Sequence, residues 1–252
     1  MISVICIYND KKIFERWLLK SLKKQTVGFE LIGIDNSKKF FNSAAEGLNY
    51  GAKQAKGEYL MFVHQDVFLR EYKWMEKAED FLSKISNLGM AGVAGKRKLR
   101  WGETPFLFLG IKRTCIGMLY HSFERKCWSF KFNKPIGVET LDEQALIIPR
   151  KIFNLLQFDG KTCKGWHLYG TDYALSIKKI GLKTFVLPLS VRHLSKGTFD
   201  KDYFETLHEI FKKHSDYLVI NTTGGIFLRN RFLNYLISII QKLRKYVING
   251  RK

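Results

Sequence analysis

The sequence has little cysteine and proline and no long hydrophobic run. Its 252 residues include four cysteines, without a C-x-x-C pair, and four prolines, which excludes a zinc knuckle or a dense disulfide framework. No uninterrupted apolar stretch reaches the roughly 18 residues of a membrane-spanning helix. The opening apolar run from Met1 to Tyr8 is too short for a secretory signal. We therefore expect a cytoplasmic protein with reduced cysteines.

Acidic residues are scarce relative to basic ones. There are 23 Asp and Glu against 43 Lys and Arg, which gives a formal net charge of +20. This charge predicts anionic partners, but it does not distinguish nucleic acid, an anionic membrane surface and phosphorylated small molecules. A hydrophobic content of 46% and an aromatic content of 14% argue against disorder and predict one large α/β domain.

A glycine-rich phosphate loop is missing after the first expected strand. Ile7-Tyr8-Asn9-Asp10-Lys11 stands where a dinucleotide site would have G-x-G-x-x-G, and no G-x-x-x-x-G-K-[ST] motif occurs. A parallel α/β protein without such a loop must hold a diphosphate in another way, and a metal ion bound by carboxylates is the simplest one. Aspartates at strand ends are therefore the first candidates for a site.

Strands and helices alternate over the first 66 residues. Strand-length apolar runs occupy Ile2–Tyr8, Phe29–Ile34 and Tyr59–Val63, with helical patterns over about 9–25 and 44–57 between them. Each strand ends in polar residues. This order predicts a wound, mostly parallel sheet flanked by helices, whose carboxyl-end loops hold the ligand.

Beyond residue 70 the expected elements are less regular. Helices are expected near 72–85, 170–179, 199–214 and 226–248, and strands near 91–94, 114–121, 145–148 and 184–187. Gly181 is expected to end the helix at 170–179 in a left-handed conformation. The last helix is amphipathic and basic, so it would either pack on the domain or a second subunit, as in a homodimer, or lie on an anionic membrane surface.

Four segments together resemble the family 2 type glycosyltransferases. They are Ile2-Ser-Val-Ile-Cys-Ile-Tyr-Asn9, Glu30-Leu-Ile-Gly-Ile-Asp-Asn-Ser37, Ala55-Lys-Gly-Glu-Tyr-Leu-Met-Phe-Val-His-Gln-Asp66 and Trp166-His-Leu-Tyr-Gly-Thr-Asp-Tyr-Ala-Leu-Ser176. The third places His64-Gln65-Asp66 where the family usually has D-x-D, as in a small glycosyltransferase-like subgroup. The resemblance implies a GT-A domain over 1–197, followed by a C-terminal helical extension over 198–252.

The activity that the resemblance implies is an inverting, hexosyltransferase-type reaction. A UDP- or GDP-sugar would donate to a glycan or lipid-linked acceptor with help from Mn²⁺ or Mg²⁺. The basic terminal helix would hold such an enzyme at the inner face of the cell membrane. The alternative is a non-catalytic basic module that binds anionic membrane or nucleic acid through one continuous basic face, and nucleic acid is the less favoured partner.

The resemblance places the donor site at the first three strand ends. Tyr8 and Asn9 are implied to line the nucleotide, and Asp35 to accept hydrogen bonds from the base or ribose. Asp66 is implied to bind the metal. His64 can also ligate Mn²⁺, but it adds no negative charge and should weaken Mg²⁺ binding. From the residues alone, Asp35 also fits an ordinary turn and Asp66 a helix cap.

The second half of the chain is implied to complete the site. Asp172 of Gly170-Thr171-Asp172 would be the base that deprotonates the acceptor, although a carboxylate stabilised by the helix dipole explains it equally simply. The other candidates are His193 on the metal, Arg192 and Lys196 on the leaving phosphate, Asp142 on the donor sugar, and Trp166 and Tyr169 as an acceptor-sugar platform. The enzyme hypothesis predicts that Asp35, Asp66 and Asp172 converge.

Overall fold

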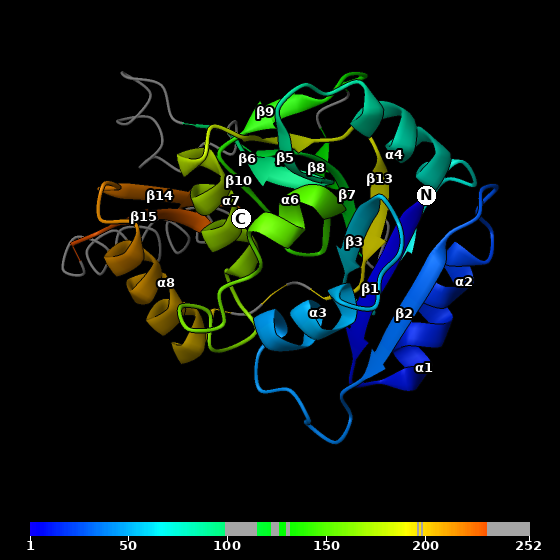
Figure 1. The fold of residues 1–252 in the computed structure, drawn as a ribbon, viewed down its shortest axis with the longest axis horizontal. Helices are drawn as coiled ribbons and strands as arrows, with labels where there is room; N and C mark the ends of the chain where they lie inside the picture. The colour runs from blue at the N-terminus through cyan, green and yellow to red at the C-terminus, as the bar shows by residue number, and fades with distance from the viewer. Residues whose placement is uncertain (99–114, 122–125, 130–131, 196, 198, 231–252) are drawn as a thin grey trace, which may run out of the picture.

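The computed structural model describes residues 1–98, 115–121, 126–129, 132–195, 197 and 199–230. Its main sheet has seven strands in the order β2-β1-β3-β11-β5-β12-β9 (Figure 1). These strands are β1 (Ile2–Tyr8), β2 (Glu30–Asp35), β3 (Tyr59–Val63), β5 (Leu88–Gly92), β9 (Ile136–Val138), β11 (Ala145–Pro149) and β12 (Lys183–Val186). The β1–β2, β1–β3 and β5–β12 pairs are parallel, whereas β11 and β9 run antiparallel to their neighbours. The wound, mostly parallel sheet is confirmed.

A second sheet lies along the carboxyl end of β3. Its order is β10-β6-β7-β13-β4, with β8 paired to β7. The strands are β4 (Val67–Leu69), β6 (Ala94–Lys96), β7 (Cys115–His121), β8 (Lys126–Ser129), β10 (Thr140–Leu141) and β13 (Ser190–His193). Val67 of β4 pairs antiparallel with His193 of β13. Residues 64–66, which immediately precede β4, therefore lie beside the end of β13.

Helices flank both faces of the main sheet. One continuous helix from Lys11 to Leu22 consists of α1 (Lys11–Phe14), a π-helical segment (Glu15–Leu19) and α2 (Lys20–Leu22). The others are α3 (Ala44–Ala52), α4 (Trp74–Ser83), α6 (Arg150–Leu155), α7 (Tyr169–Lys179) and α8 (Lys201–Lys213). Side chains of Asp10, Ser43 and Asp200 cap α1, α3 and α8 by accepting backbone N–H groups. Gly181 follows α7 with φ +80° and confirms the expected left-handed end.

The core has two halves, one on each face of the main sheet. All five residues of β3 are buried, and they alternate between the halves: Leu60 and Phe62 belong to one, Met61 and Val63 to the other. Burial on both faces explains why this strand is apolar throughout. The alternation also points the next side chain, His64, toward the half that holds α7.

The chain after α8 differs from the expected long helix. Residues Val219–Thr222 and Gly225–Leu228 form strands β14 and β15 of an antiparallel hairpin, so the prediction of helix from Ile226 is wrong at its start. Thr223 and Gly224 provide a two-residue hairpin turn, which outweighs the helical spacing of the apolar residues that follow. The rest of that helix, 231–248, lies outside the described residues, and the boundary at 197/198 stays a prediction.

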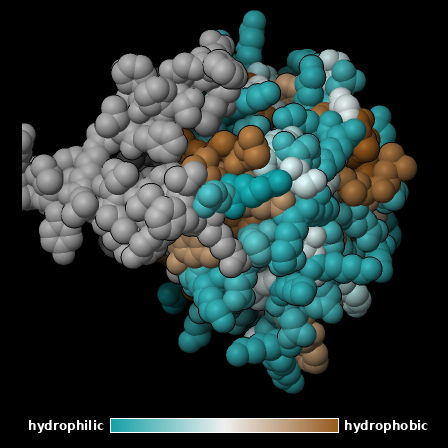
Figure 2. All heavy atoms as spheres, turned by 90° about the vertical axis from the view of Figure 1, so that its left-hand side faces the viewer, coloured by the Kyte–Doolittle hydropathy of each residue, from teal (hydrophilic) through white to brown (hydrophobic). Residues whose placement is uncertain are grey.

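On the face that carries α8 and the hairpin, the described residues in view are mostly hydrophilic, with apolar side chains among them (Figure 2). Large apolar side chains that are exposed on or beside these elements are Phe199, Phe204 and Leu218. No helix among the described residues is both long and apolar enough to cross a membrane.

Candidate active site

His64, Asp66 and His193 form a compact group at the carboxyl end of β3. One ligand atom from each residue lies within 4.8 Å of the others. His64 Nδ1 is 3.4 Å, and Asp66 Oδ1 3.2 Å, from His193 Nε2. The antiparallel β4–β13 pairing brings these residues together from positions 129 residues apart. We call this group the His-Asp-His cluster.

The protonation states of the cluster suit a divalent metal ion. Burial opposes ionisation of Asp66, but hydrogen bonds from His193 and from the Ser195 N–H, 3.0 Å away, hold its pKa well below the usual range. Burial and the neighbouring His193 lower the pKa of His64 to about 4. The cluster therefore offers a carboxylate and a neutral imidazole at neutral pH, the forms that bind metals. Two imidazoles and one carboxylate fit Mn²⁺ better than Mg²⁺, which prefers oxygen ligands.

Gln65 connects the cluster to the end of β1. Its Oε1 accepts hydrogen bonds from the backbone N–H groups of Asn9 and Asp10, both at 3.0 Å, and its Nε2 donates to Asn9 Oδ1 at 2.7 Å. The predicted nucleotide residue Asn9 therefore lies beside the cluster. We did not single out Gln65 in the sequence, although its place between two candidate ligands was a usable signal.

Tyr8 and Asp35 lie opposite each other at the ends of β1 and β2. Tyr8 stacks on Phe14, with ring centroids 4.5 Å apart. Asp35 is exposed, and its Oδ1 accepts the Ser37 N–H at 2.8 Å. Hydrogen bonds from the Ser37 side chain and from this N–H lower the pKa of Asp35. Asp35 thus makes the predicted turn and still presents a carboxylate at the same sheet edge, on the far side of β1 from the cluster.

The loop before β11 lies against the cluster. The His64 N–H donates to Gln144 O at 3.1 Å. Asp142, two residues earlier, accepts the Thr223 hydroxyl on Oδ2 at 2.8 Å and the Gln144 N–H on Oδ1 at 3.3 Å. The predicted sugar-binding carboxylate is therefore held in place close to His64.

Glu143 of the same loop is a candidate that we did not select from the sequence. Its Oε1 accepts the Gly170 N–H at the start of α7, 3.2 Å away. A Cβ on Gly170 would lie 3.0 Å from Glu143 Cγ and 2.9 Å from Leu146 Cδ1, so only glycine leaves room for this approach. Burial and the charge of Asp142 raise the pKa of Glu143 to about 8, against backbone hydrogen bonds that lower it. The usable signal was a carboxylate adjacent to Asp142.

Of the two aromatic residues predicted to form an acceptor platform, Tyr169 is buried and Trp166 is exposed. The Tyr169 ring is 3% exposed and packs edge-on against Phe158, while its hydroxyl lies 3.4 Å from both His64 Nε2 and Glu143 O. Tyr169 therefore offers a ligand its hydroxyl group and no stacking surface. Trp166 is 44% exposed, and its role as an acceptor platform stays a prediction.

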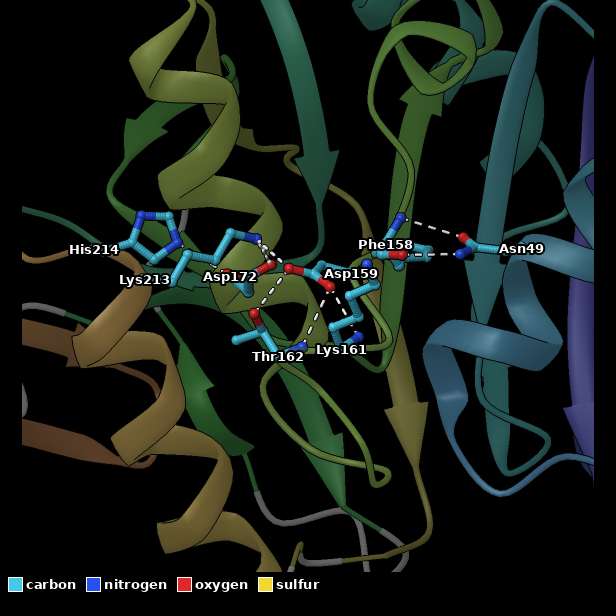
Figure 3. A network of polar contacts seen from close by, with 8 residues as sticks. All are labelled: Asn49, Phe158, Asp159, Lys161, Thr162, Asp172, Lys213 and His214. Atoms are coloured by element: carbon cyan, nitrogen blue, oxygen red, sulfur yellow. Dashed lines mark hydrogen bonds and ion pairs between the residues drawn. The ribbon is translucent and has the colours of Figure 1, made fainter.

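Asp172 points toward the end of α8 (Figure 3). It is 2% exposed; Oδ2 lies 2.7 Å from Lys213 Nζ and Oδ1 2.9 Å from His214 Nε2. Lys213 also binds Asp159 Oδ2 at 3.0 Å. Both oxygens of Asp172 thus hold α8 against α7, and because the residue is almost completely buried an acceptor hydroxyl cannot reach them in this arrangement. Asp35 and Asp66 both lie at the carboxyl edge of the sheet, but Asp172 does not join them. The expected convergence of the three carboxylates is therefore not observed.

The predicted phosphate residues can be placed only in part. Arg192 lies in β13 next to His193 and opposite Phe68 of β4, and it is partly buried. Lys196 lies outside the described residues. Ser195 is exposed, and its hydroxyl is 3.1 Å from His193 Nε2, which adds a polar group at the cluster.

A separate cavity of about 400 Å³ lies between the 162–165 loop and α8. It is lined by Thr162, Lys164, Gly165, Asp202, Glu205, Thr206, His208 and Glu209. None of these residues belongs to the His-Asp-His cluster, but Trp166 directly follows the loop. The cavity is therefore distinct from the metal-binding group.

Comparison with known sequences gives the family of the chain, and comparison with solved structures gives its fold. A sequence model described as "Glycosyltransferase like family" matches residues 3–214. The chain belongs to this family. No curated protein matches the chain.

Solved structures with the same fold are distant in sequence. GalNAc-T7 with UDP, GalNAc and Mn²⁺ matches at 14% identity and a TM-score of 0.57, over 84% of this chain and 47% of that one. The mannosyltransferase PcManGT from Pyrobaculum calidifontis, with GDP-Man and Mn²⁺, matches at 12% and 0.54, over 86% and 64%. S. aureus TarS 1-349 with UDP-GlcNAc matches at 16% and 0.54, over 84% and 66%. The chain thus spans about half to two thirds of their lengths, and the likeness establishes the GT-A fold.

Proposed function

We propose that the protein is a metal-assisted glycosyltransferase that moves a hexose from a nucleotide diphosphate to a glycan or lipid-linked acceptor. The observation that carries this proposal is the His-Asp-His cluster, which lies at the carboxyl edge of the sheet beside Asn9. Ligands bind at this edge in wound α/β sheets. The UDP or GDP-mannose and Mn²⁺ in the similar structures support the same chemistry here.

The cluster would hold Mn²⁺ in preference to Mg²⁺. A divalent cation bound there would neutralise the charge that develops on the departing diphosphate. Arg192 and Lys196 are proposed to assist on the phosphate groups. His64 and His193 supply two of the three ligands, so the affinity for the metal depends more on imidazole than it does with a D-x-D motif.

The nucleotide would bind across the ends of β1 and β2. The exposed carboxylate of Asp35 can accept hydrogen bonds from a base N–H or from ribose hydroxyls, and Tyr8 and Asn9 line the path from there to the cluster. Asp142 is proposed to accept a hydroxyl of the donor sugar, because its loop contacts His64 through Gln144.

We propose Glu143, in place of Asp172, as the base for inverting transfer. A base must reach the acceptor hydroxyl that attacks the anomeric carbon opposite the diphosphate. Both oxygens of Asp172 are bound by side chains at the end of α8, whereas Glu143 lies in the loop that contacts the cluster. Its raised pKa makes the ionised form a stronger base. Asp172 then acts by fixing α7, whose first turn donates to Glu143.

The acceptor is proposed to enter from the side of Trp166 and the 162–165 loop. Trp166 has an exposed face for a sugar ring, and the adjacent cavity has the hydroxyl, carboxylate and ammonium groups that bind polyols. Peripheral attachment to an anionic membrane surface, and a cytoplasmic location, remain part of the proposal on the strength of the sequence. The membrane attachment rests on the basic composition of the chain.

Calorimetric titration with UDP and GDP, each with and without Mn²⁺, tests the proposed function. Wild type should bind one nucleotide in the micromolar range only with the metal, and Asp66→Ala should lose this binding. Asp80→Ala is the matched control, because Asp80 is an exposed carboxylate of α4 that pairs with Lys84. It should bind like wild type.

Two results would contradict the proposal. Equal binding with and without Mn²⁺, unaffected by Asp66→Ala, would remove the metal from the mechanism. Binding of neither nucleotide would favour the non-catalytic basic module. Salt-dependent binding to anionic phospholipid vesicles or to nucleic acid would then be the property to measure.

A further inference from the structure

The β14–β15 hairpin lies beyond residue 214, where the family match ends. It stands beside α7 and α8 (Figure 1) and pairs with neither large sheet. Its first strand is nevertheless well buried, since Ile220, Asn221 and Thr222 are at most 2% exposed. The hairpin is therefore an integral part of the domain and not a loose appendage.

Hydrogen bonds attach the hairpin to the part of the domain around the predicted sugar pocket. The Thr223 hydroxyl donates to Asp142 Oδ2 at 2.8 Å. The Thr140 hydroxyl donates to Asn221 O, and Asn221 Nδ2 donates to Arg97 O at 2.9 Å. The tip of the hairpin is thus joined both to Asp142 and to Thr140, and Thr140 lies two residues before Asp142 in the chain.

The turn itself has little freedom. The Thr222 hydroxyl oxygen accepts the N–H groups of Gly224 and Gly225, both at 3.2 Å, and it lies 3.1 Å from the Tyr203 hydroxyl. A Cβ on Gly224 would lie 2.5 Å from Phe199 Cε1, so the turn fits closely against the residues that lead into α8. These contacts fix where Thr223 directs its hydroxyl.

Asp142 connects the hairpin to the His-Asp-His cluster through hydrogen bonds of Gln144. Its Oδ1 accepts the Gln144 N–H at 3.3 Å, and Gln144 O accepts the His64 N–H at 3.1 Å. An ionised carboxylate has about four acceptor directions, of which Thr223 and Gln144 occupy two. The remaining directions are available to sugar hydroxyls, and their orientation depends on the Thr223 hydrogen bond.

We propose that Thr223 is a positioning residue that sets the donor-sugar preference by orienting Asp142. The inference rests on the proposed function, in which Asp142 binds the donor sugar. A fixed carboxylate distinguishes sugar epimers, because the epimer that points its hydroxyl elsewhere leaves a buried polar group unpaired. The hairpin thereby adds a determinant of selectivity that the family-matched region does not contain.

The test compares Thr223→Val, Thr223→Ala and Thr223→Ser with wild type. Calorimetry in Mn²⁺ would measure binding of UDP, UDP-glucose, UDP-galactose, UDP-GlcNAc and UDP-GalNAc, or of GDP, GDP-mannose and GDP-glucose if wild type prefers GDP. Thr223→Val and Thr223→Ala should bind the free nucleotide like wild type but reduce the preference between epimeric donors about fivefold, as expected for one lost hydrogen bond. Thr223→Ser keeps the hydroxyl and should keep the preference.

Thr26→Val is the matched control, because the Thr26 hydroxyl also donates to a carboxylate, Glu76 Oε2 at 3.2 Å, between α2 and α4. It should leave every affinity unchanged. An unaltered epimer preference in Thr223→Val and Thr223→Ala, or a wild type without any preference, would overturn the inference while nucleotide binding still supports the proposed function. Failure of wild type to bind any nucleotide would overturn both.

Discussion

The Asp172 carboxylate and the Lys213 ammonium group lie 2.7 Å apart, although 41 residues separate them in the sequence. His214 binds the other oxygen of Asp172, and Asp159 shares Lys213 (Figure 3). Three segments, α7, the end of α8 and the turn at 159–162, therefore meet in one ion-pair network. The buried carboxylate has a structural role here, and removing it leaves the buried His214 without this partner and Lys213 with Asp159 alone.

Asp172→Ala should lower the free energy of unfolding by about 3 kcal/mol, because it breaks a buried ion pair from one side. Urea denaturation followed by circular dichroism measures the change. Asp80→Ala removes an exposed carboxylate paired with Lys84 one helical turn away, and it should have little effect. Equal destabilisation by the two variants would show that the network does not hold α8 in place.

Continuous apolar runs made the main sheet predictable. β1 and β3 coincide with the expected Ile2–Tyr8 and Tyr59–Val63, because strands buried on both faces leave this plain pattern. The metal-binding roles of His64, Asp66 and His193 were expected from the motifs that resemble the family 2 type glycosyltransferases, and the structure brings the three residues together. Local sequence carries information of this kind.

The direction of Asp172 could not be predicted in the same way. A carboxylate in the first turn of a helix has the same sequence pattern whether it faces a ligand or another helix. The partner of Asp172, Lys213, is remote in the chain and gives no local signal. Glu143 was not considered as a base for a similar reason, because its contact with Gly170 exists only after α7 docks. The hairpin was missed because the apolar residues from Ile226 onward fit a helical period.

Glu143→Gln should reduce sugar transfer by at least about a hundredfold, the usual loss when a general base is removed. Binding of the free nucleotide with Mn²⁺ should be unchanged, since Gln keeps the size of the side chain. Turnover of a donor that wild type accepts, together with the calorimetric affinity, measures both effects. If Asp172→Asn instead abolishes turnover while remaining folded, and Glu143→Gln stays active, Asp172 is the base.

The stability of wild type should depend on pH through Glu143. Burial and the charge of Asp142 raise the pKa of Glu143 to about 8 in the folded protein, from an ordinary value of 4.5. The folded state therefore retains a proton that the unfolded chain has lost, so the contribution of Glu143 to stability falls as pH rises between these two values. The glutamine side chain of the Glu143→Gln variant does not titrate, so the variant does not lose stability at this position as pH rises.

Thermal unfolding of wild type and Glu143→Gln from about pH 5 to about pH 8.5 checks the sign of this linkage. The melting temperature of the variant relative to wild type should rise steadily over the range. Other groups near Glu143, including Asp142, Tyr169, Tyr203 and Cys163, remain in both proteins, so the difference isolates Glu143. A constant difference would mean that Glu143 is ionised throughout the range.

His64→Asp should shift metal preference toward Mg²⁺. The substitution restores the carboxylate of a D-x-D motif and replaces an imidazole, which Mg²⁺ binds poorly, with an oxygen ligand. The Mn²⁺ to Mg²⁺ affinity ratio, measured calorimetrically with the bound nucleotide, should fall about tenfold, the scale on which ligand surroundings tune such sites.

Without metal, the added carboxylate lies close to Asp66, so the variant should also melt at a lower temperature than wild type and recover when Mg²⁺ is added. Asp66→Asn is the contrasting variant and should bind both metals weakly. An unchanged ratio in His64→Asp would mean that His64 does not contact the metal, and that Asp66 and His193 hold it with the diphosphate alone.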